Sequence, residues 1–156
     1  MRRTFDRRSV LGLAVGSAAG AVLVSAKPTY AAGTTYKASL DGKSEVPPTT
    51  SSGTGTATVT YDPATKTVTW EGTFSGLSGP ATAAHIHGPA EAGKNAGVIV
   101  PLSQAGTPFT SPFKGSATLP DDKAAALSTA LSSGQAYVNV HTAANPGGEV
   151  RGQLKS

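Results

Sequence analysis

The sequence predicts a mainly β domain, an antiparallel sandwich or barrel-like fold, with one short α-helix near residues 120–132. Three observations support this prediction. Short runs that alternate apolar and polar residues recur every eight to twelve residues or so, and Gly, Pro, Asp and Asn separate them. Only one segment repeats its apolar residues at helical spacing. Residues 33–156 show no internal repeat and have the length of a single domain.

The expected strands are short and lie close together along the chain. Residues 55–61 and 67–74 alternate and are rich in Thr and Val, so they predict a hairpin around the turn at 62–66. The other strands are expected at 36–40, 84–89, 98–102, 113–119, 135–142 and 149–154. Their alternation places five aromatic residues in the core: Tyr61, Trp70, Phe74, Phe113 and Tyr137.

The helix is expected over residues 120–132. Pro120 suits the first turn, and Asp121 and Asp122 interact favourably with the positive end of the helix dipole. Gly134 suits the cap at the C-terminal end. The apolar residues at helical spacing are Ala124, Leu127 and Leu131.

Residues 1–32 are expected to be a twin-arginine-type signal peptide that is removed on export. Arg7 and Arg8 precede an apolar run at 10–24, which is shorter than the roughly 20 apolar residues of a membrane-spanning helix. Small residues at 31–33 suit cleavage, so an uncleaved N-terminal anchor fits these flanks less well. We therefore expect a periplasmic or extracellular protein with no membrane span after cleavage.

The charge distribution argues against nucleic acid as a partner. The whole chain has a formal net charge of +4, but residues 33–156 carry eight basic and eight acidic residues. Their lysines are scattered and form no basic stripe. The chain has no cysteine, which rules out disulfides and thiolate metal sites, so packing alone must hold an exported domain together.

The chain has three histidines, and their placement suggests one site. His85 and His87 are two residues apart on an expected strand and therefore share a face, about 6.6 Å apart at Cα. Tyr137, Asn139 and His141 share a face of another expected strand. If the two strands pair, the three imidazoles converge.

Two interpretations of this cluster stay open. Imidazole is a good ligand for copper or zinc, and three His ligands with an open position form a known type of zinc site. Ring nitrogens within about 3–4 Å of one another would fit Zn–N bonds of about 2.0–2.1 Å, and a wider scatter would not. Proton competition would weaken such binding below about pH 6. Alternatively, the rings are structural and bond to Asn139, Glu149 or the backbone.

Glu149 and Arg151 are also two residues apart on an expected strand. One interpretation is functional: with Asn139, they would support the histidine ligands, and Arg151 would steer anions. The other is architectural, as an ion pair or turn anchor. No residue is expected to be catalytic, because the serines lack the strand–nucleophile–helix context of a hydrolase.

Three segments taken together resemble the CHRD domain family, named after chordin. They are Leu40-Asp41-Gly42-Lys43-Ser44-Glu45-Val46-Pro47-Pro48, Ala84-His85-Ile86-His87-Gly88-Pro89-Ala90, and Tyr137-Val138-Asn139-Val140-His141-Thr142 followed by Asn145 to Leu154. The resemblance covers about residues 35–155. It implies an exported, mainly β domain and brings no general catalytic activity with it.

The run His85-Ile86-His87-Gly88 is also similar to a strand of copper–zinc superoxide dismutase, which shares the expected immunoglobulin-like sandwich outline. That enzyme's two-metal site needs more histidines, and its disulfide needs cysteines that this chain lacks. We therefore reject it as a close match. Two hypotheses remain: a non-enzymatic binding or structural module with an extracellular ligand, or a copper or zinc protein with simple redox or hydrolytic chemistry.

Overall fold

The computed structural model describes residues 33–104 and 106–156, and the expected signal segment lies outside these residues. Eight strands form one antiparallel sheet in the order β5-β4-β7-β8-β1-β2-β3-β6. The elements are β1 (Thr34–Asp41), η1 (Gly42–Ser44, a 3₁₀ turn), β2 (Thr54–Asp62), β3 (Thr67–Ser75), β4 (Ala81–His87), β5 (Val98–Pro101), β6 (Phe113–Thr118), α1 (Asp121–Ser132), β7 (Tyr137–Thr142) and β8 (Val150–Gln153). The predicted mainly β fold with one short helix is confirmed.

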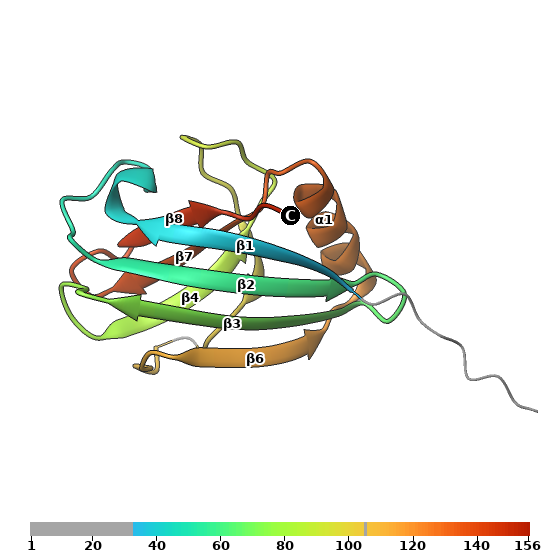
Figure 1. Cartoon of the computed structure of the whole chain (residues 1–156), viewed down its shortest axis with the longest axis horizontal. Helices are drawn as coiled ribbons and strands as arrows, with labels where there is room; N and C mark the ends of the chain where they lie inside the picture. Colours follow the sequence, from blue (N-terminus) through green and yellow to red (C-terminus); the bar gives the residue numbers. More distant parts are fainter. Residues whose placement is uncertain (1–32, 105) are drawn as a thin grey trace, which may run out of the picture.

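The sheet curls into a half-barrel rather than lying flat. Figure 1 shows β1, β2, β3 and β6 side by side, with β7 and β4 behind them and α1 at one end. The Trp70 indole N–H donates to the carbonyl of Leu102 over 3.1 Å, which ties β3 to the residue after the edge strand β5. This bond draws the two halves of the curled sheet together.

The predicted hairpin and helix both form. Strand β2 pairs with β3 over its whole length, from Thr54 opposite Ser75 to Asp62 opposite Thr67. Helix α1 begins one residue later than expected, because Pro120 is its extended N-cap. It ends before Gly134, whose φ of 68° is the left-handed conformation that favours glycine. Among the described residues, no helix is long and apolar enough to cross a membrane.

The apolar core fills the inside of the curl. Val59 and Val68 of one half and Ile86, Val138 and Val140 of the other have no exposed surface. The aromatic predictions are mostly correct. Tyr61 and Phe113 are buried, while Trp70 and Phe74 are partly buried and pack against the core. Tyr137 is buried too, but on the opposite face of the sheet, outside the apolar cluster.

Strand β7 is buried on both faces. All six of its residues are buried, although they alternate between polar and apolar. Val138 and Val140 belong to the apolar core, whereas Tyr137, Asn139 and His141 point the other way. Contacts from residues 45–46 and 94–96 reach this second face, so it forms a polar layer beneath two loops rather than a solvated surface.

Candidate metal centre

The histidine-bearing strands lie side by side. Strands β4 and β7 pair antiparallel, with His85 opposite Asn139, His87 opposite Tyr137, and Ala83 opposite His141. Because residues opposite each other in an antiparallel pair share a face, all three imidazoles point into the polar layer. The convergence that the alternation predicted is therefore present.

One pair of ring nitrogens is as close as two ligands of one metal ion, but the three together are spread too widely to share an ion without movement. His85 Nδ1 lies 3.0 Å from His141 Nε2. One ligand atom from each of the three rings lies within 4.8 Å of the others, so the widest pair exceeds the roughly 3–4 Å expected for one zinc ion and that expectation is not met. Four ligands at Zn–N distances of about 2.0–2.1 Å are about 3.3 Å apart, so the widest separation must shorten by about 1.5 Å to enclose an ion. The cluster could hold a metal after a small ring movement.

Backbone carbonyls orient two of the rings. His87 Nδ1 lies 3.0 Å from the carbonyl of Ala96, and His141 Nδ1 lies 3.0 Å from that of Pro146. Because a carbonyl only accepts, both Nδ1 atoms carry the proton, so each neutral ring presents a lone pair at Nε2. Ligand histidines usually donate their second N–H to such a carbonyl. His87 Nε2 is buried without a hydrogen-bond partner.

All three imidazoles are held in the neutral form that binds metals. Burial, together with the neighbouring rings of His141 and His87, lowers the pKa of His85 to about 4. Burial also lowers the pKa of His87 and of His141, although their carbonyl partners act in the opposite direction. Two rings are buried and His85 is only partly buried, so His85 marks the side from which an ion would enter.

Asn139 and Arg151 are both part of this layer. Asn139 Oδ1 lies 2.9 Å from His141 Nε2. Arg151 is 1% exposed, and its Cζ stands 3.4 Å from the centre of the Tyr137 ring. The His87 ring stacks on the same tyrosine, with a centroid separation of 4.9 Å and an interplanar angle of 4°. Since β7 lies between β4 and β8, Tyr137 separates the cation from the histidine.

The layer is closed by the loop between β4 and β5. Arg151 donates to the carbonyl of Lys94 over 2.7 Å and to Asn95 Oδ1 over 3.0 Å. The backbone N–H of Ala96 donates to the Tyr137 hydroxyl over 3.1 Å. One loop therefore contacts the arginine, the tyrosine and, through the Ala96 carbonyl, a histidine, so its position and that of the His87 ring are linked.

The CHRD domain family model matches residues 36–154, which include every residue of this layer. The chain belongs to the CHRD domain family. No match was found among curated proteins or among solved structures. The family assignment carries no specific activity, so the chemistry of the site must be argued from its own geometry.

In the CHRD domain, Glu149 fits the architectural interpretation of a turn anchor and does not support the histidine ligands. It precedes β8 and accepts hydrogen bonds from Ser51, Ser78, Thr142 and Asn145. These donors come from three separate connecting segments and the end of β7, so Glu149 anchors loops at one end of the sheet. No hydrogen bond joins it to a histidine, and no ion pair joins it to Arg151 within the described residues.

Sequence reasoning missed Glu45, which it named only within a segment that resembles the CHRD family. The side chain is 4% exposed, and its Oε1 has no hydrogen-bond partner. Burial raises the pKa of this carboxyl, while the nearby Arg151 charge lowers it. The available signal was weak: Glu45 stands beside Val46, Pro47 and Pro48, and Arg151 is the one arginine of residues 33–156.

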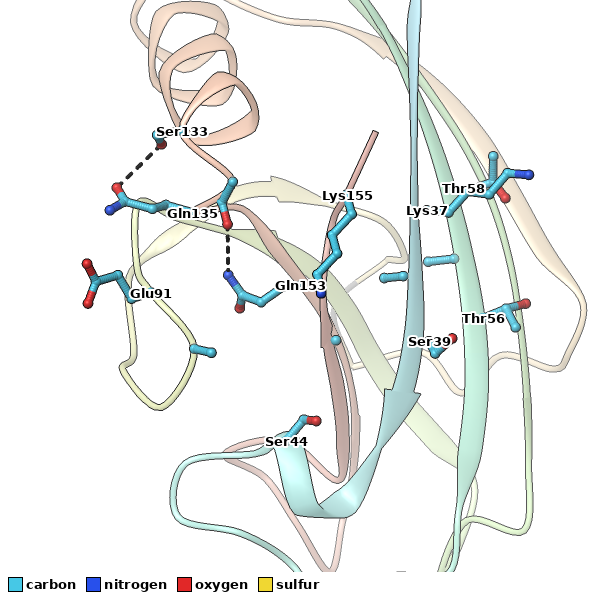
Figure 2. A pocket seen from close by; sticks show the side chains of 15 residues that line it. Lys37, Ser39, Ser44, Thr56, Thr58, Glu91, Ser133, Gln135, Gln153 and Lys155 are labelled. Carbon is cyan, nitrogen blue, oxygen red and sulfur yellow. Dashed lines mark hydrogen bonds between the residues drawn. The ribbon is translucent and has the colours of Figure 1, made fainter.

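A separate groove of about 830 Å³ lies beside the polar layer and contains none of the histidines. Figure 2 shows polar side chains around it, including Lys37, Ser39 and Thr58 on the strands and Gln135 after the helix. Gln153 borders both regions, because it lines the groove and its Oε1 accepts from Arg151 over 3.2 Å. The groove has no aromatic residue and no cluster of metal-binding side chains, so the histidine cluster is the stronger candidate site.

Proposed function

We propose that this CHRD domain is a metal-binding module that works outside the cytoplasm and holds one copper or zinc ion between His85, His87 and His141. The observation that carries the proposal is the donor arrangement. Three neutral imidazoles meet in one buried layer, and the buried Nε2 of His87 makes no hydrogen bond, although the Asn139 side chain is a polar neighbour of this ring. An unpaired buried nitrogen costs about 1–3 kcal/mol, and a bound cation would remove that cost.

The ligand chemistry favours copper or zinc over harder ions. Imidazole suits zinc and copper, whereas calcium and magnesium require mostly oxygen ligands. The three histidines are the only group of three or more metal-binding side chains found among the described residues. We propose binding and no catalytic step.

Export is part of the proposal and rests on the signal-like sequence of residues 1–32. The twin-arginine route transports folded proteins, which suits a domain that acquires its metal before leaving the cytoplasm. N-terminal sequencing of the protein recovered from a periplasmic or culture fraction tests this point. A mature terminus near residue 32 is expected, and an intact N-terminus in the cytoplasmic fraction would refute export.

The experiment for metal binding is a titration of chelator-treated protein with Zn²⁺ and Cu²⁺, followed by elemental analysis after desalting. We expect one ion per chain and its loss in His87→Gln. The matched control is Asp122→Asn, which removes an exposed carboxylate on α1 and should keep full stoichiometry. Equal metal content in wild type and His87→Gln would refute the site.

The competing function is a purely structural role, as in a binding module without metal. One observation favours it: His87 and His141 already hold two loops through the carbonyls of Ala96 and Pro146. In that case His87→Gln would lower the melting temperature of metal-free protein, and added zinc would stabilise neither form. Stabilisation of wild type alone by zinc decides for the metal site.

A further inference from the structure

The contact between the Asn139 amide oxygen and the His141 ring has no proton to form a hydrogen bond. His141 Nδ1 donates to the Pro146 carbonyl, so neutral His141 presents only a lone pair at Nε2. That nitrogen faces His85 Nδ1 at 3.0 Å and Asn139 Oδ1 at 2.9 Å. A proton on His85 Nδ1 satisfies the first contact. The second remains a contact between two acceptors, which a bound cation would relieve.

Glu45 explains why the Asn139 amide has this orientation. Glu45 Oε1 and Asn139 Nδ2 lie 2.2 Å and 2.7 Å from the point where a Cβ on Gly148 would stand, so the carboxylate and the amide nitrogen are neighbours. The Asn139 side chain lowers the pKa of this carboxyl, which burial raises, and Glu45 Oε1 itself has no hydrogen-bond partner. Rotating the amide by half a turn would place its oxygen against this carboxylate instead.

We propose that Asn139 Oδ1 is a fourth ligand of the metal ion, with Glu45 as the residue that positions it. This inference rests on the proposed function. Asn139 Oδ1 lies 2.9 Å from His141 Nε2, which in turn lies 3.0 Å from His85 Nδ1. These values are close to the spacing of about 3.3 Å between ligands of one zinc ion. Three imidazoles and one amide oxygen form the site.

The oxygen ligand also narrows the choice of ion. Amide oxygen is a hard ligand, whereas Cu⁺ prefers soft sulfur ligands and binds oxygen weakly. An oxygen atom as the fourth ligand therefore favours Zn²⁺ or Cu²⁺ over Cu⁺. The buried Arg151 charge is separated from the ion by the Tyr137 ring, and the Glu45 carboxylate beside Asn139 offsets part of it. The site accordingly selects a divalent ion over a monovalent one.

NMR of the wild-type protein tests the ligand directly. The sequence contains three asparagines, Asn95, Asn139 and Asn145, so selective ¹⁵N-asparagine labelling gives three side-chain amide pairs. One equivalent of Zn²⁺ should shift the Asn139 pair strongly. The Asn145 pair, which bonds to Glu149 and Ser78, is the internal control and should stay in place.

Variants give an independent measure of the same contact. Asn139→Leu keeps the size of the side chain without its oxygen, and we expect its zinc affinity to fall about tenfold or more. Asn139→Asp keeps an oxygen ligand and adds a negative charge, so its affinity should equal or exceed that of wild type. Glu45→Gln should weaken binding, while Glu91→Gln removes the same charge from an exposed loop position and should not.

The outcomes separate this inference from the proposed function. A shifted Asn139 pair together with weaker binding by Asn139→Leu supports the oxygen ligand. Zinc that binds one to one and is lost in His87→Gln, but leaves the Asn139 pair unmoved and Asn139→Leu unweakened, overturns the ligand and keeps the metal site. Wild-type protein that binds no zinc overturns both. An unmoved Asn139 pair overturns the oxygen ligand without any variant, even if Asn139→Leu does not fold.

Discussion

Glu149 offers a quantitative prediction about acid stability. Its side chain is fully buried, yet Ser51 Oγ donates to Oε1 over 2.7 Å and the backbone N–H of Ser78 donates to it over 2.6 Å. The hydroxyls of Ser78 and Thr142 each donate to Oε2 over 2.5 Å. Burial alone raises the pKa of this carboxyl, but the hydrogen bonds outweigh it and lower the pKa from 4.5 to about 2.

The lowered pKa converts into stability through proton linkage. A decrease in pKa of about 2.5 corresponds to about 3 kcal/mol of unfolding free energy. Because the folded-state pKa is the lower one, this contribution is fully present above about pH 4.5 and is lost as the pH falls towards 2. Below pH 2 the carboxyl is protonated in both states, and the contribution has disappeared.

The perturbation is Glu149→Gln, which removes the charge and turns one acceptor into a donor. Its new NH₂ group would face hydroxyl and backbone donors, so we expect a loss of about 3 kcal/mol at pH 7 that shrinks as the pH falls to 2.5. Urea denaturation of chelator-treated protein across this range measures the difference. Glu91→Gln, at an exposed loop position, is the control. A gap between wild type and Glu149→Gln that stays constant from pH 7 to pH 2.5 would refute the argument.

Three further predictions concern the polar layer. Arg151→Lys should lower the unfolding free energy by about 2–4 kcal/mol in urea denaturation, because an ammonium cannot both stack on Tyr137 and donate to two loop oxygens, whereas exposed Lys114→Ala should have little effect. Gly148→Ala should cost about 2 kcal/mol or more by the same assay, since φ is 131° and its Cβ would stand 2.2 Å from Glu45 Oε1. Zinc affinity, measured by competition with a chelator, should hold from pH 7 to pH 6 and fall near pH 4–5, because burial lowers the pKa of His85 to about 4 and protons then compete for the ligands. A steep loss already between pH 7 and pH 6 would contradict that ordering.

The sequence was sufficient to predict which side chains share a face, but not what covers that face. Alternation in Ala84–His87 and Tyr137–Thr142 predicted that His85, His87 and His141 converge, and β4 pairs with β7 as required. Alternation normally marks a strand with one solvated face. Here β7 is buried on both sides, because two loops cover the polar residues. Loop contacts between segments far apart in sequence leave no local pattern.

The expectation that Glu149 and Arg151 share a face, because they are two residues apart, fails at the start of β8. Residues two apart share a face only while the strand stays extended and paired. Gly148, with a φ of 131°, lies just before Glu149, and the strand itself starts at Val150. The Glu149 carboxylate accordingly joins Ser51, Ser78 and Thr142, whereas Arg151 lies under the loop at Lys94 and Asn95. The turn decides the outcome, and its geometry depends on Gly148 having no Cβ to collide with Glu45.

In the polar layer, one bound ion would satisfy polar groups that lack partners. Burying polar groups is unfavourable unless each finds a partner. Among the buried side-chain atoms that the structure describes, two lack one: His87 Nε2 and Glu45 Oε1. The first belongs to the histidine cluster, and the second lies beside the amide of Asn139, whose oxygen faces His141. A divalent cation at the cluster would bind the free nitrogen, would turn the contact between Asn139 and His141 from repulsive to bonding, and would polarise the amide so that its nitrogen donates more strongly towards Glu45. Protonation of His141 would relieve only the contact between Asn139 and His141. The lowered pKa of His141 opposes this protonation at neutral pH.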